Sequence, residues 1–214
     1  MATLTSTLDY KSLSLEQLFS TSDIFCVPRY QRGYSWGEEQ VRELLEDLQE
    51  SYVASRSEGY LLGQVIVCPG PRSTSDINDW EIIDGQQRLT TLYLFCLCSF
   101  LLTSPDDRSK MGGNRELKFS HLQSSLFWFD DSTPSSSSGD HRQPRMTVAA
   151  DGDSVIRGLI FSGQLSETLE SPSQRNLHSA YLQIEEFLTS SQFDTPEDRW
   201  NFVDFVLQKT VFIR

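Results

Sequence analysis

The sequence predicts an α+β fold, with short strands and longer helices in a single domain over residues 1–214. Short apolar runs bounded by Gly and Pro are typical of buried strands. Longer segments carry apolar residues at every third or fourth position, which is the period of an amphipathic helix. The composition, 38% hydrophobic and 22% charged, is typical of a globular domain, and the length suffices to bury a core.

The strands are placed by apolar runs and by the residues that end them. Tyr60 to Cys68 is predicted to be one central strand, because apolar residues fill it with little alternation and Pro69 ends it. The other expected strands are Ile24–Val27, Trp80–Asp84, an edge strand at Arg145–Ala149 and the start of a strand at Val211–Arg214.

The helices are placed by capping residues and by apolar spacing. Ser14 and Gln17 form a capping-box pattern, and Thr195 followed by Pro196 marks the start of the last helix. The helix that Ser14 caps is expected over 15–19. Further helices are expected over 41–52, 89–102, 155–160 and 177–188, with Asp151 as the cap of the one at 155–160. Because 89–102 is apolar nearly throughout, it is predicted to be a buried core helix.

Residues 130–144 are predicted to form a flexible loop inside the domain. A run of serines from Ser135 to Ser138 gives this segment a low-complexity composition with little apolar surface for packing. The well-patterned sequence on both sides argues against a domain boundary there. A strand that starts at Val211, with no polar tail after it, leads us to expect a domain that is truncated at its C-terminus.

Charge and cysteine spacing exclude several classes of protein. Eighteen Lys and Arg against 30 Asp and Glu give a net charge of −12, which argues against non-specific nucleic-acid binding by the chain alone. No segment has the composition of a secretory signal or of a membrane-spanning helix. Cys26, Cys68, Cys96 and Cys98 lack the spacing of a zinc site or a disulfide scaffold. We therefore expect a cytoplasmic protein with reduced, packing cysteines and no membrane partner.

The segment from Asp84 to Thr91 has the features of an anion site at a helix start. The first N–H groups of a helix are unpaired and carry partial positive charge, and Gly85 would let a ligand approach the backbone closely. Arg88 adds a planar donor fork that suits phosphate oxygens, and Thr90 and Thr91 add hydroxyl groups. The alternative is an ordinary helix start that needs no ligand, with Asp84 as the N-cap and Gln87, at the third helical position, returning its side chain to it.

The segment from Pro28 to Trp36 is a second candidate, because it combines basic and aromatic residues without an acid. The guanidinium groups of Arg29 and Arg32 could grip phosphates while aromatic faces stack on a base. The alternative is a loop that Tyr34 and Trp36 anchor to the core, with its arginines paired to surface carboxylates.

Together the two segments resemble the N-terminal domain of GmrSD-type modification-dependent restriction endonucleases. Val27-Pro-Arg-Tyr-Gln-Arg-Gly-Tyr-Ser-Trp36 matches the family pattern Ile/Val-Pro-x-Tyr-Gln-Arg-x-Tyr-x-Trp. Asp84-Gly-Gln-Gln-Arg88 matches the Asp-Gly-Gln-Gln-Arg motif, and Tyr60-Leu-Leu-Gly63 lies on a strand between the two. The resemblance implies a ParB/sulfiredoxin-like α+β fold, with a small mixed sheet as its core and several packed helices.

The resemblance also implies a Mg²⁺-dependent nucleoside triphosphatase domain that regulates DNA restriction in phage defence. Nucleotide binding is implied for Arg29, Tyr30, Gln31, Arg32, Gly85, Thr90 and Thr91. Catalytic roles are implied for Asp84, Gln86, Gln87 and Arg88. Asp84 would hold Mg²⁺ or orient a water, Gln86 or Gln87 would position the nucleophile, and Arg88 would stabilise the transferred charge.

The nuclease centre is expected to lie outside this chain. The family's third motif, Phe-x-x-x-Asn-x-x-Gly, does not occur, and His121, His141 and His178 are scattered without metal-binding spacing. DNA would therefore be a partner through a missing C-terminal region or a partner subunit. Two other functions stay open: a non-hydrolysing DNA- or nucleotide-binding module of ParB-like type, and a structural interaction domain.

Overall fold

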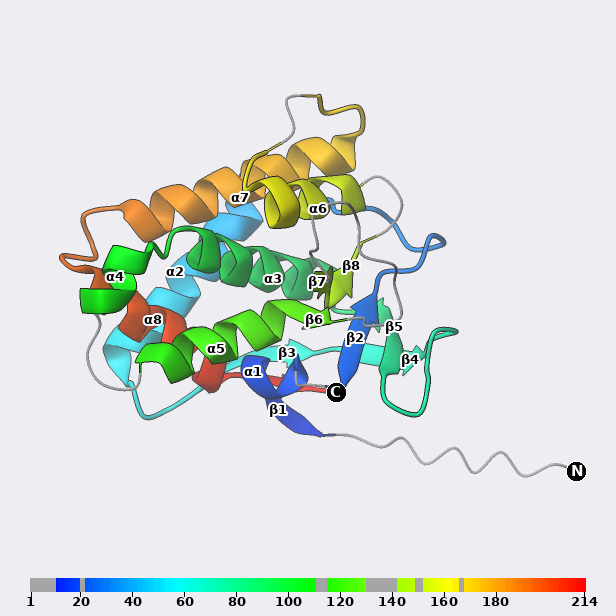
Figure 1. Ribbon diagram of the computed structural model, residues 1–214, viewed down its shortest axis with the longest axis horizontal. Helices are drawn as coiled ribbons and strands as arrows, with labels where there is room; N and C mark the ends of the chain where they lie inside the picture. Colours follow the sequence, from blue (N-terminus) through cyan, green and yellow to red (C-terminus); the bar gives the residue numbers. More distant parts are fainter. Residues whose placement is uncertain (1–10, 20–21, 111–114, 130–141, 149–151, 166–167) are drawn as a thin grey trace, which may run out of the picture.

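The computed structural model describes residues 11–19, 22–110, 115–129, 142–148, 152–165 and 168–214. Helices and small mixed sheets make up this part of the chain, which confirms the α+β prediction (Figure 1). The helices are α1 (Leu15–Leu18), α2 (Glu38–Ala54), α3 (Gln86–Leu101), α4 (Pro105–Lys110), α5 (Arg115–Leu126), α6 (Asp153–Ser162), α7 (Pro172–Thr189) and α8 (Pro196–Lys209). None of the described helices is long and apolar enough to cross a membrane.

The described strands pair into three small sheets. They are β1 (Ser12–Ser14), β2 (Asp23–Cys26), β3 (Tyr60–Gln64), β4 (Ile66–Pro69), β5 (Asn78–Asp84), β6 (Phe127–Phe129), β7 (Arg142–Pro144), β8 (Met146–Thr147) and β9 (Thr210–Ile213). One sheet has the order β4-β5-β2-β8, in which β2 runs parallel to both of its neighbours and β4 is antiparallel to β5. The others are β1-β9-β3 and the antiparallel pair β6-β7.

The prediction of one central strand over Tyr60–Cys68 is wrong, because the chain changes sheets at Val65. β3 pairs with β9 whereas β4 pairs with β5, and the Val65 N–H donates to the Ile213 carbonyl at 2.9 Å. A bulge between Leu61 and Gly63, where Gly63 has φ +114°, bends the strand just before the change. The apolar run therefore serves two sheets rather than one.

The other elements that the sequence predicted agree with the structure to within a few residues, whereas β1, α4, α5 and β6 were not predicted. α1 begins with the expected capping box of Ser14 and Gln17, and α8 begins with Thr195 as its N-cap and Pro in its first turn. β8 is an edge strand as expected, although it is shorter than Arg145–Ala149. Residues 142–144 of the expected loop form β7, because they pair with β6, and residues 130–141 lie outside the described part. Asp151 also lies outside it, and α6 is preceded by Gly152 as its N-cap.

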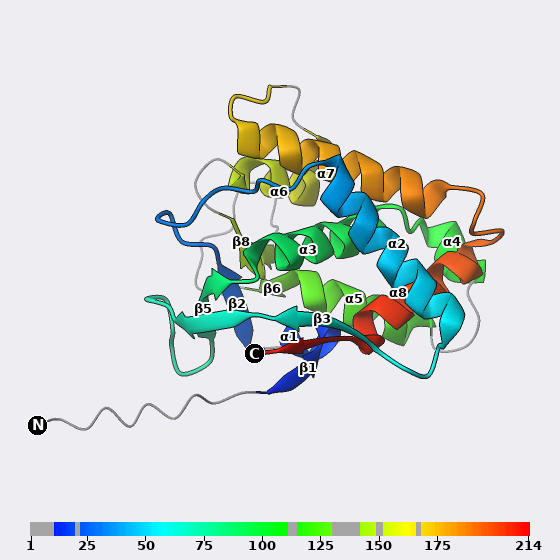
Figure 2. The same ribbon diagram turned by 180° about the vertical axis from the view of Figure 1, so that it is seen from behind.

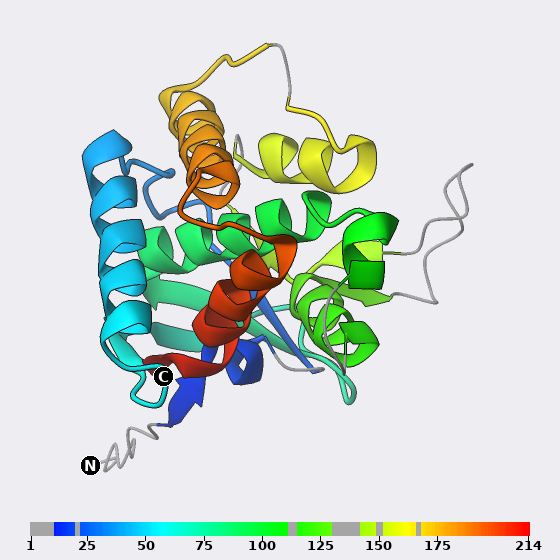
Figure 3. The ribbon, with the colours of Figure 1, turned by 90° about the vertical axis from the view of Figure 1, so that its left-hand side faces the viewer.

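The central helix α3 carries the core and presents its first turn at the end of β5. Its residues are buried almost throughout, which confirms the predicted core helix. α3 packs against α5, α6 and α7, and α7 in turn packs against α2, as the side view shows (Figure 3). Because β2 and β5 are parallel neighbours, the loop after β2 and the turn from β5 into α3 leave the same edge of the sheet.

Candidate functional site

The two sequence motifs meet where the loop after β2 passes the start of α3. Gln31 Nε2 donates a hydrogen bond to the carbonyl of Ile83 at 3.1 Å. In the opposite direction, Gln86 Nε2 donates to the carbonyl of Arg32 at 3.2 Å. Each motif therefore uses a glutamine to hold the backbone of the other.

Gln87 makes the densest set of these contacts. Its Oε1 accepts hydrogen bonds from the backbone N–H groups of Ser35 (2.8 Å) and Trp36 (3.2 Å), and its Nε2 donates to the carbonyl of Gly33 at 3.3 Å. The side chain is buried. Because both the oxygen and the nitrogen of its side-chain amide are hydrogen-bonded to the loop, Gln87 holds the loop against the start of α3.

The first turn of α3 has no side-chain cap. Gly85 is the N-cap with φ +85°, and the capping pair of Asp84 and Gln87 considered from the sequence is not formed. A Cβ on Gly85 would lie 2.8 Å from the carbonyl oxygen of Gln64, so both the conformation and the close approach require glycine here. The first turn contains no acidic residue that would offset the partial positive charge of the helix start, and the nearest acid in the sequence is Asp84, just before the N-cap.

A cleft of about 490 Å³ opens beside this helix start. That volume is within the usual range of small-ligand sites, roughly 300 to 1,000 Å³. The cleft is lined from both motifs, by Gln31, Arg32, Trp36, Ile83, Asp84, Gly85, Gln86, Gln87 and Arg88.

The guanidinium groups near the cleft are free to bind a ligand. Arg29, Arg32 and Arg88 are exposed, and within the described part of the chain none of them makes a hydrogen bond or an ion pair. Arg72 and Arg214, by contrast, each bond a carboxylate at 2.7 Å. The structure therefore does not show the alternative in which Arg29 and Arg32 pair with surface carboxylates.

Side-chain oxygens of two cleft residues also accept no hydrogen bond from the described part of the chain. Asp84 supplies a carboxylate that is exposed and makes no hydrogen bond with the described residues. Gln86 is buried, and its Oε1 accepts no hydrogen bond. An unsatisfied buried acceptor costs about 1–3 kcal/mol, so a donor from a ligand or a water would be stabilising at this atom.

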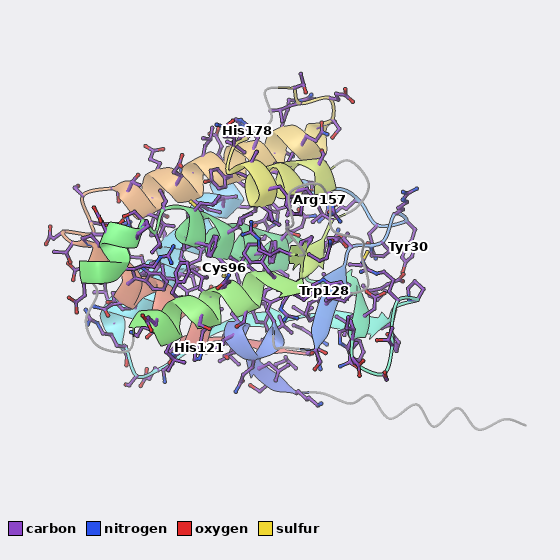
Figure 4. All side chains as sticks on the ribbon, viewed as in Figure 1. Tyr30, Cys96, His121, Trp128, Arg157 and His178 are labelled. Carbon is purple, nitrogen blue, oxygen red and sulfur yellow. The ribbon has the colours of Figure 1, made fainter. Side chains whose placement is uncertain are left out.

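The remaining candidate residues lie outside the lining of the cleft. Tyr30 is 69% exposed at the edge of the molecule (Figure 4), and its hydroxyl donates to Glu81 Oε2 at 3.0 Å, which raises the pKa of Tyr30. Thr90 and Thr91 are buried in α3. The Thr91 hydroxyl donates to the Gln87 carbonyl at 2.9 Å and lies 2.7 Å from the hydroxyl of Tyr34. Both threonines thus belong to the packed side of the helix.

The structure adds residues that sequence reasoning did not assign to the site. Trp36 and Ile83 line the cleft, and for Trp36 the sequence had left open both stacking on a base and anchoring of the loop to the core. Tyr34 does pack in the core, and burial raises its pKa. The signal for Trp36 was its place in the first motif; nothing in the sequence indicated Ile83.

The described residues contain no group of three or more His, Cys, Asp or Glu that could hold a metal ion. His121 lies on α5 and His178 on α7, on opposite sides of the molecule (Figure 4). His121 Nδ1 is 2.6 Å from a carboxylate oxygen of Glu16 on α1.

Comparison with known proteins identifies one family for nearly the whole chain. Residues 15–213 match the model of the family described as GmrSD restriction endonuclease, N-terminal domain. No curated protein sequence matches the chain. The matched range includes both motifs and every residue that lines the cleft.

Proposed function

This chain belongs to the family of GmrSD restriction endonuclease N-terminal domains and is thus a component of a restriction or phage-defence system; from this premise we propose that it binds and hydrolyses a nucleoside triphosphate and thereby regulates DNA restriction. One observation carries the proposal. Arg32 and Arg88, from two motifs, lie at one cleft without partners among the described residues, beside a helix start that has no side-chain cap and no acid in its first turn.

The phosphates of the nucleotide would occupy the cleft at the start of α3. Backbone N–H groups at a helix N-terminus and arginine forks both bind phosphate oxygens. Arg32 and Arg88 would neutralise the phosphate charge from the two motifs. Arg29 and Tyr30 lie on the same loop outside the lining, where they would contact parts of the ligand that extend beyond the cleft.

Asp84 would hold Mg²⁺ at this cleft. Mg²⁺ in nucleotide sites is usually bound by one or two carboxylates together with substrate phosphates and waters, and the free carboxylate of Asp84 fits that pattern. The ion would supply charge neutralisation to the phosphates during transfer.

The two glutamines of the second motif would have different tasks in hydrolysis. Gln86 has an unpaired acceptor, so it is the better candidate to orient the attacking water. Gln87 is engaged with the loop and would keep Arg32 in place. Arg88 would stabilise the charge that develops on the transferred phosphoryl group. DNA would be engaged by another region or a partner subunit.

A nucleotide screen tests this function. We expect at least one of the four common ribonucleoside triphosphates to bind in the presence of Mg²⁺ and to release phosphate, with and without modified DNA. Arg32→Ala and Arg88→Ala should abolish binding, whereas Arg42→Ala, at an exposed position on α2, should bind as the wild type does.

The outcomes separate the proposed function from its alternatives. Binding without phosphate release, or direct competition by DNA for the cleft, would favour a non-hydrolysing binding module. If no triphosphate binds to the wild-type protein by calorimetry, the nucleotide function is wrong, and an interaction domain is left as the explanation.

A further inference from the structure

The loop of the first motif is held from a second side by α7. The backbone N–H of Tyr34 donates to Ser173 Oγ at 2.9 Å, and Asn176 Nδ2 donates to the carbonyl of Tyr34 at 3.5 Å. The two residues of the first contact are separated by 139 positions in the sequence, and those of the second by 142 positions. Figure 2 shows the loop, in blue, running from β2 to α2 past the first turns of α7.

The approach of α7 to the loop is close enough to depend on glycine. A Cβ on Gly33 would lie 2.9 Å from both Cβ and Oγ of Ser173, a separation that requires one of the two segments to move. Gly33 therefore lets the first turn of α7 come into direct contact with the loop backbone.

Every polar group of Tyr34 is consequently fixed. Its N–H and carbonyl are bonded to α7, its hydroxyl is 2.7 Å from that of Thr91 on α3, and its ring is buried. Residues 31–36 belong to no strand or helix, so these side-chain contacts replace the backbone ladder that would otherwise set the path of the loop.

We propose that Ser173 and Asn176 are positioning residues of the nucleotide site, which act through Tyr34 to hold Arg32 at the cleft opposite the start of α3. The proposal rests on the proposed function, because it concerns the same ligand. Arg32 lies two residues before Tyr34 and lines the cleft, so a shift of the Tyr34 backbone displaces the guanidinium that the phosphates would meet.

Positioning of a binding group has a kinetic signature that loss of stability lacks. If α7 only stabilises the fold, its weakening reduces the fraction of active protein, and kcat falls at constant KM. If α7 positions Arg32 for ground-state contact with the phosphates, affinity is lost while saturated protein still turns over, so KM rises at nearly constant kcat.

Ser173→Ala and Ser179→Ala form a matched pair for this test. Both serines are half-buried on α7, but Ser179 Oγ contacts Gln183 on the same helix, whereas Ser173 Oγ contacts the loop. We expect Ser173→Ala to raise the Kd and KM for the triphosphate about 3- to 10-fold, the range for one lost hydrogen bond, with kcat within about twofold of the wild type. Ser179→Ala should change neither constant.

Gly33→Ala tests the same contact from the loop side. The added Cβ should push α7 away and raise Kd by at least as much as Ser173→Ala does. Gly37→Ala is the control on the same loop, because the nearest atom to its Cβ would be Gln40 Oε1 at 3.6 Å, an ordinary contact. It should bind as the wild type does.

A double-mutant cycle shows whether the effect passes through Arg32. Arg32→Lys is expected to retain weak, measurable binding, and adding Ser173→Ala to it should cost less than Ser173→Ala costs in the wild type. Equal costs in both backgrounds would overturn the proposal, as would equal Kd values for Ser173→Ala and Ser179→Ala or a fall in kcat at constant KM. If the wild-type protein binds no triphosphate, the proposed function itself fails.

Discussion

Gln87 Oε1 accepts the backbone N–H of Ser35 at 2.8 Å, a hydrogen bond that spans 52 residues and joins the two motifs. With its contacts to Gly33 and Trp36, this side chain replaces a stretch of backbone pairing. Its neighbour Gln86, equally buried, makes a single hydrogen bond to the loop. Adjacent identical residues thus differ in how much of the loop each supports.

Gln87→Met is therefore expected to lower the free energy of unfolding by about 1–3 kcal/mol, because it leaves partly buried backbone groups without partners. Gln86→Met removes one bond together with an already unsatisfied acceptor, so its effect on stability should be smaller. Urea unfolding of both variants measures the difference. Equal losses would contradict the assignment of Gln87 as the residue that fastens the loop.

Gly63 lies close to Arg88, so a side chain added at Gly63 is expected to weaken ligand binding. A Cβ at Gly63 would be 3.0 Å from Arg88 Nη1, so Gly63→Ala should displace the guanidinium and weaken triphosphate binding several-fold. Gly163→Ala is the matched control, because both glycines have positive φ but nothing lies within 4 Å of a Cβ at Gly163. Both variants should lose about 1 kcal/mol or more of stability from backbone strain. If the two bind nucleotide equally, Gly63 does not position Arg88.

The parts of the site that the sequence could predict are those that depend on short-range chemistry. Gly85, with Arg88 three residues later, indicated a helix start that could bind an anion. The run of apolar residues alone indicated the buried helix that follows. Arg32 was assigned to the same site because its segment, Val27–Trp36, matches a family pattern that occurs together with the motif at this helix start.

The parts that escaped sequence reasoning depend on tertiary contacts. The change of sheets at Val65 could not be predicted, because the first half of one apolar run pairs with β9 and the second half with β5, and apolar character does not distinguish the two pairings. Ser173 contacts the loop over 139 residues, and a serine in the first turn of a helix is otherwise an ordinary polar residue. How many hydrogen bonds Gln86 and Gln87 each make with the loop likewise depends on the path of the loop, because the two residues are of the same type.

Asp23 should make the protein sensitive to acid. Burial alone would raise the pKa of Asp23, but hydrogen bonds from Trp80, Arg214 and Asn78 outweigh it and hold the pKa below its ordinary value of 3.8. Because the folded pKa is the lower one, the unfolded state binds the proton more tightly. The stability from this carboxylate is present above about pH 4 and is lost as the pH falls through the folded pKa.

The expected result is a fall in the free energy of unfolding below about pH 4 that is less steep in Asp23→Asn. Asp194→Asn, at an exposed position, should keep the wild-type pH dependence. Arg214→Met should cost about 1.5–3 kcal/mol at pH 7, because it removes a 2.7 Å charged hydrogen bond at a largely buried carboxylate. Parallel pH profiles of the wild type and Asp23→Asn would refute the role of Asp23.

The four cysteines should divide into two classes of reactivity. Cys96 and Cys98 are buried in α3, Cys96 at the centre of the molecule (Figure 4), and burial raises the pKa of both thiols to about 12. Cys26 and Cys68 are half-buried, free thiols on β2 and β4. Since the thiolate is the reactive form, a thiol-specific reagent at pH 8 should label Cys26 and Cys68 in the folded protein and all four thiols in urea.

The double variant Cys26→Ser/Cys68→Ser isolates the buried pair and should take up almost no reagent until it unfolds. The raised pKa values also imply that stability falls above about pH 9, because unfolded thiols ionise there while the buried ones stay protonated. Cys96→Ala in that double variant should make this alkaline fall less steep. Rapid labelling of the folded double variant at pH 8 would show that α3 opens far more readily than its packing against α5, α6 and α7 implies.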